Sequence, residues 1–440
     1  MTGTATIAKT GVFETILESA AGLPSPELIQ GLRQKGRESF ASLGLPSRRQ
    51  EDWRFTRLKD IEEQIFEAPG VVASSIDISP WRVSDAYLLV FVDGIFSPEI
   101  SEVSELPDGV VVSNLVLATA SNSKVVSKHL GSLAGLERHP FAALNTALVA
   151  DGAFIHLPAG VELERPIQLV FVSGSEGRST LSAPRILIVA EAASRATVLE
   201  QHLGDNGASL SCPVSEILLA EDAVLDHVVV QEEDPTAHHL ALRQIHLAAG
   251  GRYSGQTVSL GGALARTDID VVLDGEGATA SLDGLYLVDE AQQADTHLTV
   301  RHAQPNCESH QLYKGILAGS SRAVFNGRII VDKDAQKTDA NQANRNLLLS
   351  DNATVHSNPQ LEIFADDVRC THGSTVGRLD EEAIFYLRSR GIARDEAIRL
   401  LTLAFAGEVL ERIPVDELRE RLAVVIALRL AAMADNGESA

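Results

Sequence analysis

Residues 249–278 read AGGRYSGQTVSLGGALARTDIDVVLDGEGA, in which short runs of β-branched and aliphatic residues stand between small, polar, glycine-rich corners. The same texture extends from about Phe154 to about Arg378. Corners of this kind begin at positions 190, 220, 249, 274, 304, 318 and 350, so most steps are 25 to 32 residues long. Such a pattern predicts many short strands joined by tight turns.

A repeat of that length without helical segments indicates a solenoid, in which each coil buries its inward side chains against the neighbouring coils. We therefore predict a mainly β protein with a parallel β-helix core. Two other architectures also contain many short strands. A β-sandwich expects turns every ~8 to 12 residues, and a left-handed β-helix expects a six-residue rhythm that this sequence does not show.

Helical patterns flank the predicted solenoid on both sides. Ser25 as N-cap, Pro26 at the first helical position and Gly44 as the stop predict an N-terminal helix. Residues 87–92, followed by Asp93 and Gly94, predict a strand and a tight turn. After residue 380 the apolar period becomes 3.6, which predicts three closing helices. The expected units are 1–110 (helical and mixed), 111–378 (β-helix) and 379–440 (helical).

Composition excludes several classes of protein. The 440 residues hold 37 Lys and Arg against 60 Asp and Glu, a formal charge of −23, which would repel a nucleic acid backbone. Three dispersed cysteines suit a reducing compartment better than a disulfide framework, so we expect a cytoplasmic protein. No apolar run is long enough for a signal peptide or a membrane span, because Arg429 interrupts the most apolar late stretch.

The sharpest chemical feature is Cys370-Thr371-His372. Residues i and i+2 of a strand share one face, so the thiol and the imidazole would project together. Thiolate and imidazole suit iron or zinc, but two ligands fill only half of a tetrahedral site. Another chain would have to complete it. The alternative is a buried thiol beside a hydrogen-bonded histidine, with Asp366 and Asp367 as a solvated corner.

The other candidate residues favour structural roles. Adjacent His238 and His239 would face opposite sides of a strand, so they and His246 are expected to be solvated or packed. Cys212 and Cys307 have no partner at ligand spacing. The sequence holds no nucleotide-binding loop, no nucleophile elbow and no zinc-protease helix motif. We therefore expect a protein that is not an enzyme.

Two stretches carry a resemblance to a known family. Residues 46–56 read PSRRQEDWRFT, and residues 358–380 read NPQLEIFADDVRCTHGSTVGRLD, followed by FYLRSRGI at 385–392. Together they resemble the SufB/SufD family of iron–sulfur cluster assembly proteins over roughly residues 46–415. The resemblance is closer to the SufD branch, because the stretch that matches Cys-Thr-His-Gly at 370–373 reads more like Glu-His-Glu-Ala in SufB.

The resemblance implies a right-handed β-helix that pairs with SufB in a complex containing two copies of the ATPase SufC. It also implies that Cys370 and His372 lie at the SufB interface and share a nascent iron–sulfur cluster, or iron, with ligands from SufB. ATP would act only through SufC, a flavin is uncertain, and the chain alone could form a homodimer. The residues that match the SufC docking region are Phe385, Tyr386, Arg388, Arg390, Leu401 and Phe405.

Two rival interpretations stay open. A β-helix polysaccharide lyase or hydrolase would need export and a groove lined by carboxylates, and the sequence predicts no export. A purely structural interaction module would keep Cys370 and His372 as core residues without any metal. Substitution of these two residues separates the module from the assembly scaffold.

Overall fold

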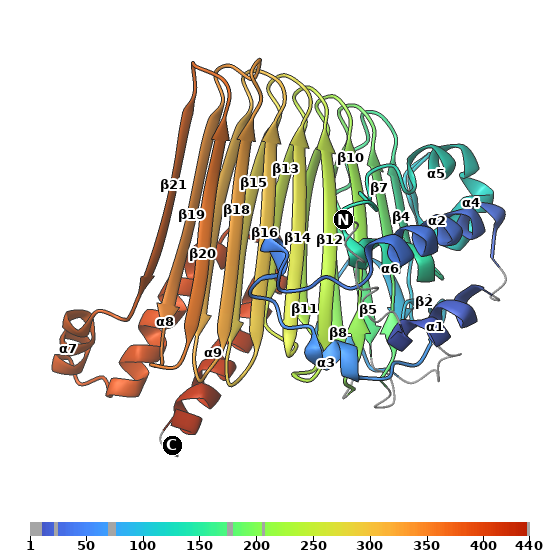
Figure 1. Ribbon diagram of the computed structural model, residues 1–440. Coiled ribbons are helices and arrows are strands. Elements are labelled where there is room, and N and C mark those ends of the chain that lie inside the picture. Colours follow the sequence, from blue (N-terminus) through green and yellow to red (C-terminus); the bar gives the residue numbers. More distant parts are fainter. Residues whose placement is uncertain (1–10, 22–24, 69–75, 174–178, 205–206, 438–440) are drawn as a thin grey trace, which may run out of the picture.

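The fold is a β-solenoid whose strands form two facing sheets (Figure 1). The computed structural model describes residues 11–21, 25–68, 76–173, 179–204 and 207–437. Along most of the solenoid the chain alternates between the sheets, and neighbouring strands within each sheet run parallel. This arrangement confirms the prediction of a mainly β solenoid flanked by helices.

The strands are numbered in chain order and divide between the two sheets. Sheet 1 contains β1 (Tyr87–Val92), β2 (Ile95–Phe96), β5 (Ile167–Ser173), β8 (Arg195–Gly204), β11 (Val224–Glu232), β13 (Arg252–Ser259), β15 (Thr279–Val288), β17 (Glu308–Leu317), β19 (Asp339–Leu348) and β21 (Arg369–Gly377). Sheet 2 contains β3 (Val111–Asn114), β4 (Gly152–Leu157), β6 (Leu181–Ser182), β7 (Arg185–Ala190), β9 (Leu210–Ser211), β10 (Val214–Leu219), β12 (His238–Leu247), β14 (Leu264–Leu273), β16 (Gln293–His302), β18 (Arg322–Val331) and β20 (Thr354–Ile363).

The strand register reproduces the repeat in the sequence. Along sheet 1, Arg195 pairs with position 224, and this column continues through 252, 279, 308, 339 and 369, in steps of 29, 28, 27, 29, 31 and 30 residues. One coil is therefore two strands and two corners. The 14-residue step between the predicted corners at 304 and 318 is half a coil.

The corners depend on residues in the left-handed region of backbone conformation. Gly250 and Gly319 adopt positive φ, as expected for glycine, and Asn306 does so at 59°. Two further corners contain Glu290 at φ 51° and Lys337 at φ 60°. The sequence analysis missed these two because neither position carries a typical turn residue.

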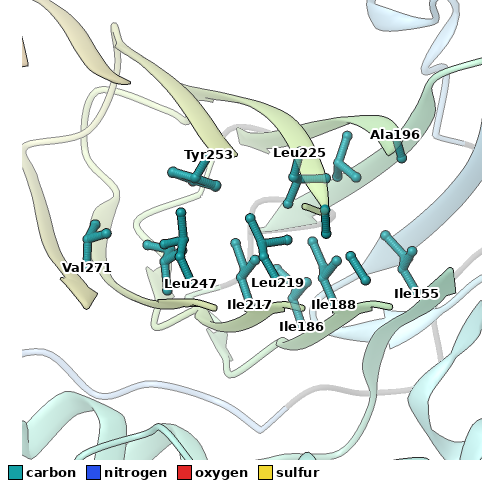
Figure 2. Close-up of a cluster of buried hydrophobic side chains, with 14 of the residues drawn as sticks. Ile155, Ile186, Ile188, Ala196, Ile217, Leu219, Leu225, Leu247, Tyr253 and Val271 are labelled. Carbon is teal, nitrogen blue, oxygen red and sulfur yellow. The ribbon is translucent and has the colours of Figure 1, made fainter. Parts of the chain in front are cut away.

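Apolar side chains fill the space between the two sheets (Figure 2). In β7, Ile186 and Ile188 point inward, whereas Leu187 between them packs on the outer face against another cluster. Sheet 1 contributes Leu225 and Tyr253 from the opposite side of the core. Each strand is thus buried on both faces in this part of the molecule, which explains the nearly continuous apolar runs in the sequence.

N-terminal helices cover the outer face of sheet 2. They are α1 (Gly11–Ala21), α2 (Glu27–Leu43), α3 (Lys59–Glu63), α4 (Leu115–Ser121), α5 (Ser123–His129) and α6 (Pro140–Leu148), with short 3₁₀ turns at Glu51–Trp53 and Ser79–Trp81. The N-cap prediction was wrong by one residue: Pro26 takes that position, and the Ser25 hydroxyl accepts a hydrogen bond from Arg33 at 3.2 Å instead. Gly44 ends α2 at φ 63°, as predicted.

Three helices close the chain, of which the second and third cover the outer face of sheet 1. They are α7 (Glu381–Ser389), α8 (Arg394–Leu410) and α9 (Asp416–Gly437), which confirms the three predicted helices. Arg412 Nη1 donates to Asp283 Oδ1 of β15 at 2.7 Å. At the start of α9, Glu417 Oε2 accepts a hydrogen bond at 2.8 Å from the backbone N–H of Ser84, which precedes β1. This Ser84–Glu417 clasp joins residues 333 positions apart.

The predicted boundaries at 110/111 and 378/379 stay predictions, because the helices and the solenoid are in contact throughout. Strand β1, from the expected first unit, pairs in parallel with β5, with Tyr87 opposite Ile167. The strand predicted at 87–92 is therefore confirmed, and it forms part of the solenoid. Among the described residues, no helix is both long and apolar enough to cross a membrane.

Candidate functional site at the open end of the solenoid

The C-terminal end of the solenoid is open. The last strand of sheet 2, β20, pairs with β18, and the last strand of sheet 1, β21, pairs with β19 (Figure 1). Within the described part of the chain, neither has a partner along its other edge. Most residues of β21 are exposed. We call β20 and β21 together the open end.

Cys370 and His372 lie on β21 at this open end. In the parallel register, Cys370 is opposite Ala340 and His372 is opposite Gln342, both of which are buried in the core. Paired residues of parallel strands share a face, so both side chains lie on the inner face of sheet 1. The prediction that they share a face is confirmed. Cys370 is half-buried against the apolar cluster that contains Ala340 and Ala365, and His372 is exposed.

Burial raises the pKa of the Cys370 thiol above its ordinary value, and the negative charge of nearby Asp339 adds to this effect. The thiol is therefore protonated at neutral pH. A metal that binds it must release this proton, since the thiolate is the ligand.

The site is incomplete as a metal centre. Among the described residues, no group of three or more His, Cys, Asp or Glu side chains is arranged to hold a metal ion. Asp366 and Asp367 are exposed at the corner that precedes β21, as expected for a solvated turn. Cys370 and His372 fit a cluster or an iron ion only as two of its ligands, and the remaining ligands would come from outside the described chain.

The other candidates from the sequence lie away from the open end. Cys212 and Cys307 are buried and unpaired, and burial raises the pKa of each thiol. His238 and His239 are both buried, whereas His246 is partly exposed and lies 3.1 Å from Asp274. These positions agree with structural roles.

The predicted docking residues divide into two groups. Phe385, Tyr386, Arg388 and Arg390 are exposed on α7 and at its C-terminal end, with Phe385 72% and Tyr386 58% exposed. Leu401 and Phe405 are half-buried on α8, where they line a shallow pocket with Val376 and Leu379. Phe405 also packs against Lys314 of β17, 4.4 Å from the ring centre. The α7 side chains are therefore the more accessible part of this set.

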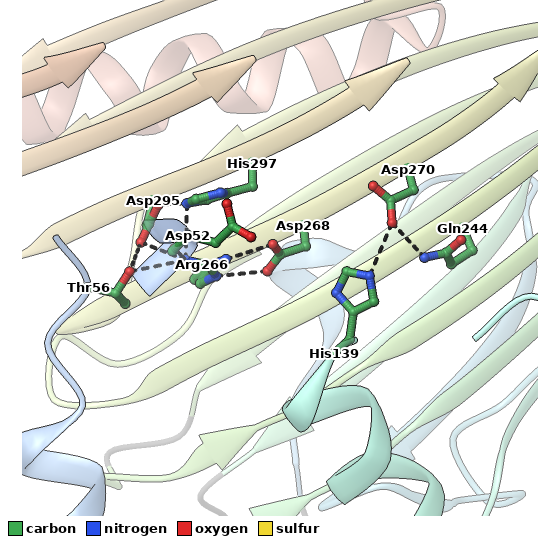
Figure 3. A network of polar contacts seen from close by, with 9 residues as sticks. All are labelled: Asp52, Thr56, His139, Gln244, Arg266, Asp268, Asp270, Asp295 and His297. Carbon is green, nitrogen blue, oxygen red and sulfur yellow. Dashed lines mark hydrogen bonds and ion pairs between the residues drawn. The ribbon is translucent and has the colours of Figure 1, made fainter. Parts of the chain in front are cut away.

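The segment that resembles the family's N-terminal motif lies across the outer face of sheet 2, where Arg266 of β14 holds it (Figure 3). The Arg266 guanidinium lies 3.8 Å from the centre of the Trp53 ring and donates to the Asp52 carbonyl at 2.7 Å. Phe55 stacks on His356 of β20 with 4.0 Å between ring centres. We call residues 46–57 the strap; it extends to the open end.

Two carboxylates neutralise Arg266, the buried Asp295 and the partly buried Asp268. Asp268 accepts its hydrogen bonds at 2.8 Å, and Asp295 Oδ2 lies 3.3 Å from Nη1. Burial alone would raise the pKa of Asp295, but Arg266 and His297 bring it below its ordinary value. Sequence reasoning missed this network. Arg266 and Asp295 are one coil apart and directly opposite each other in the register, which the sequence alone does not reveal.

A second polar group that the sequence analysis missed lies deep in the core. Glu200 Oε2 is 3.0 Å from His227 Nε2, and His227 Nδ1 is 3.0 Å from the Tyr253 hydroxyl. Burial opposes ionisation of Glu200, but hydrogen bonds from His202 and His227 hold its pKa well below the ordinary value. These groups satisfy one another, as buried polar side chains require.

Comparison with known proteins agrees with this architecture. The model of the SUF system FeS cluster assembly SufBD core domain matches residues 171–405, and the SufBD protein N-terminal region matches residues 18–169. The chain therefore belongs to the SufBD family of the SUF iron–sulfur cluster assembly system.

Two of the relatives within that family carry the name SufD. The iron–sulfur cluster assembly protein SufD of Escherichia coli is 33% identical over 420 residues, covering 94% of this chain and 95% of the relative. SufD of Bacillus subtilis is 30% identical over 335 residues, covering 73% and 74%. A SufBD family protein of Synechocystis is 33% identical over 421 residues, covering 91% of each chain.

Proposed function

We propose that this protein is a non-catalytic scaffold of iron–sulfur cluster assembly, which holds iron or a forming cluster at its open end together with SufB. One observation carries the proposal. Among the described residues, β20 and β21 have no partner along their outer edges, and β21 presents Cys370 and His372 on one face. Family membership supplies the class of process.

Pairing with SufB would complete both the fold and the site. An exposed strand edge presents unpaired backbone N–H and C=O groups, which a second strand can satisfy. A partner that extends the sheets at β20 and β21 would bring its own side chains beside Cys370 and His372. Thiolates and carboxylates from SufB would then fill the remaining ligand positions. A second copy of this chain could occupy the same edges when SufB is absent.

The C-terminal helices would dock SufC, through which ATP acts. Large apolar side chains on α7 are exposed beside two arginines, a combination that is typical of protein interfaces. Substitution of Phe385 and Tyr386 by Ala is expected to abolish co-purification of SufC. Val424→Ala is a matched control, because Val424 is 59% exposed on α9 and lies outside the predicted docking set. Normal SufC binding by the α7 variant would contradict this assignment.

The proposed complex operates in the cytoplasm, since three unpaired thiols suit a reducing compartment. The sequence and the described residues give no feature that assigns a flavin to this chain. Cys370 and His372 would contribute a thiolate and an imidazole to an iron site, and that site is shared with the partner.

The test is anaerobic co-purification of this chain with SufB and SufC from the same source, followed by a visible spectrum and iron and sulfide assays. We compare the wild type with His372→Ala and Cys370→Ser. His246→Ala is the control, because His246 lies on the outer face of sheet 2, away from the open end. Loss of cluster content in the first two variants alone is the expected result.

A wild-type chain that does not assemble with SufB and SufC would contradict the scaffold proposal. Full cluster content in both open-end variants would instead favour the second candidate, a structural interaction module. The half-burial of Cys370 against the apolar cluster around Ala340 is the specific observation in favour of that alternative.

A further inference from the structure

A column of side chains on the inner face of sheet 1 leads directly to His372. The register places Leu282, Gln311, Gln342 and His372 opposite one another on successive strands β15, β17, β19 and β21. Gln311 is 2% exposed and Gln342 is 1% exposed. Two buried amides therefore stand between the apolar core and the histidine of the open end.

The two amides form a ladder in which one side chain donates a hydrogen bond to the other. Gln342 Nε2 donates to Gln311 Oε1. The oxygen and nitrogen of a primary amide point in different directions from its carbon, so a Gln342 nitrogen that donates to Gln311 leaves the oxygen directed away from that hydrogen bond. Gly327 of β18 leaves room for this amide, since a Cβ there would lie 2.4 Å from Gln342 Nε2.

The Gln342 end of this ladder has a polar atom without a hydrogen-bond partner among the described residues. This atom is Gln342 Oε1, which is buried. A buried carbonyl oxygen without a partner costs free energy, and such atoms are rare in folded proteins. The next side chain in the column is His372, whose ring carries an N–H in either neutral tautomer.

We propose that Gln342 is a positioning residue that accepts the ring N–H of His372 through Oε1, with Gln311 fixing the amide. One ring nitrogen of His372 is then occupied, and the other is turned, unprotonated, toward the open end. Metal-bound histidines commonly donate their second N–H to a carbonyl or carboxylate, which fixes tautomer and ring orientation. The inference rests on the proposed function, because orientation matters only if His372 binds iron or a cluster.

Two substitutions at Gln342 separate positioning from simple packing. Gln342→Glu keeps an acceptor oxygen, whereas Gln342→Met keeps the volume and removes the acceptor. A packing role predicts that Met is tolerated and that Glu, a buried charge, is harmful. A positioning role predicts the reverse: the orientation of the His372 ring is kept in Gln342→Glu and lost in Gln342→Met. Asn346→Leu is the control, because Asn346 is a buried amide on the same strand opposite Val376.

The first measurement uses the isolated chain, without any metal. Histidine labelled with ¹⁵N in the ring reports the tautomer by NMR at a pH above 8, and the His372→Ala spectrum assigns the signal. We expect one tautomer in the wild type, in Gln342→Glu and in Asn346→Leu, and a mixture in Gln342→Met. An unchanged tautomer in Gln342→Met would overturn the proposed hydrogen bond. Thermal unfolding shows whether each variant is folded.

The second measurement is iron content of the complex with SufB and SufC. We expect Gln342→Met to lower iron affinity by about tenfold, and Gln342→Glu and Asn346→Leu to retain it. If His372→Ala loses iron while Gln342→Met does not, the positioning inference fails and the proposed function stands. If His372→Ala and Cys370→Ser both retain iron as well, the proposed function fails, whatever the tautomer measurement shows.

Discussion

The two ends of the solenoid differ in how their sheet faces and edges are covered. Near the N-terminal end, helices α4 to α6 pack on the outer face of sheet 2, and β7 is buried on both faces. At the C-terminal end, β21 is largely exposed and β20 is partly buried, and no described strand pairs with the outer edge of either, although the strap touches His356. Solenoids require capped ends for solubility, so an uncapped end is a surface for another chain. We therefore expect stability to be concentrated at one end, and we propose that assembly takes place at the other.

The largest expected effect is at the capped end. Ile188 is fully buried in the core between the sheets, so Ile188→Ala should cost about 4 kcal/mol of unfolding free energy through lost burial and a cavity. Val376→Ala at the open end should change it by less than about 0.5 kcal/mol, since Val376 is 50% exposed. Urea denaturation checks both. Equal effects would contradict the comparison.

The second effect concerns the strap. Arg266→Gln removes the arginine that pairs with the buried Asp295 and the partly buried Asp268, which should cost about 3 kcal/mol. The same change at the exposed Arg301, paired with Asp332, should cost about 0 to 1 kcal/mol. We also expect Arg266→Gln to release the strap, measured as faster proteolytic cleavage within residues 46–57. Unchanged proteolysis would show that Trp53 packing alone holds the strap.

A smaller effect is expected in the core where tyrosines lie over glycines. A Cβ at Gly315 would lie 2.1 Å from a Tyr286 ring carbon, so Gly315→Ala should destabilise the protein by about 2 kcal/mol. Gly373→Ala on β21 is the control, because nothing lies within 4 Å of its Cβ position. Thermal unfolding of the two variants measures the difference. Adding Tyr286→Leu to Gly315→Ala should recover part of the loss, and simple additivity would argue against the clash.

The attachment of α8 and α9 should depend on pH. Burial raises the pKa of Asp283 to about 6, although Arg412 opposes this. A raised carboxyl pKa means that the folded state binds the proton more tightly, so this group's contribution to stability is present below the unfolded pKa and is lost as the pH rises through about 6. The expected loss is on the order of 2 kcal/mol.

Denaturation between pH 4.5 and 7.5 tests this expectation by comparing the wild type with Asp283→Asn. The Asn variant should lack this part of the pH dependence. Identical pH profiles for the two proteins would show that Asp283 stays ionised throughout.

The last substitution, Val376→Lys, should have the smallest effect on the free energy of unfolding and the largest effect on assembly. Val376→Lys adds a charge to an exposed edge strand and should change the unfolding free energy by less than about 0.5 kcal/mol. We expect it to prevent pairing at β21, measured by size-exclusion chromatography with SufB and SufC. Retained assembly would place the partner contact elsewhere.

Much of the fold was predictable because corner residues such as Gly250, Gly277 and Asn306 mark where strands end. The corners at Glu290 and Lys337 were not, since their left-handed conformation is imposed by the coils on either side and not by the residue type. The number of residues per coil followed from the corners that were visible.

The candidate site was predictable in part. The shared face of Cys370 and His372 follows from their i, i+2 spacing in a strand. Their place in the last part of the solenoid agrees with the predicted end of the β-helix at 378, but the uncovered edges of β20 and β21 were not predictable, because the closing helices could have packed over them. The contacts of Arg266 and Gln342 depend on the register between coils, which links residues about 30 positions apart and leaves no local trace in the sequence.

The Ser84–Glu417 clasp has a consequence for the order of events during synthesis. Each coil can pack on the preceding one as soon as it leaves the ribosome, since coil contacts span about 30 residues. The clasp must wait for 333 further residues, and the outer face of sheet 1 stays uncovered until α8 and α9 are made. The growing chain therefore exposes Leu199, Val228 and Val258 from the synthesis of their strands until α8 and α9 are made. Chaperones that recognise apolar strands would find their target on this face, and only for that interval.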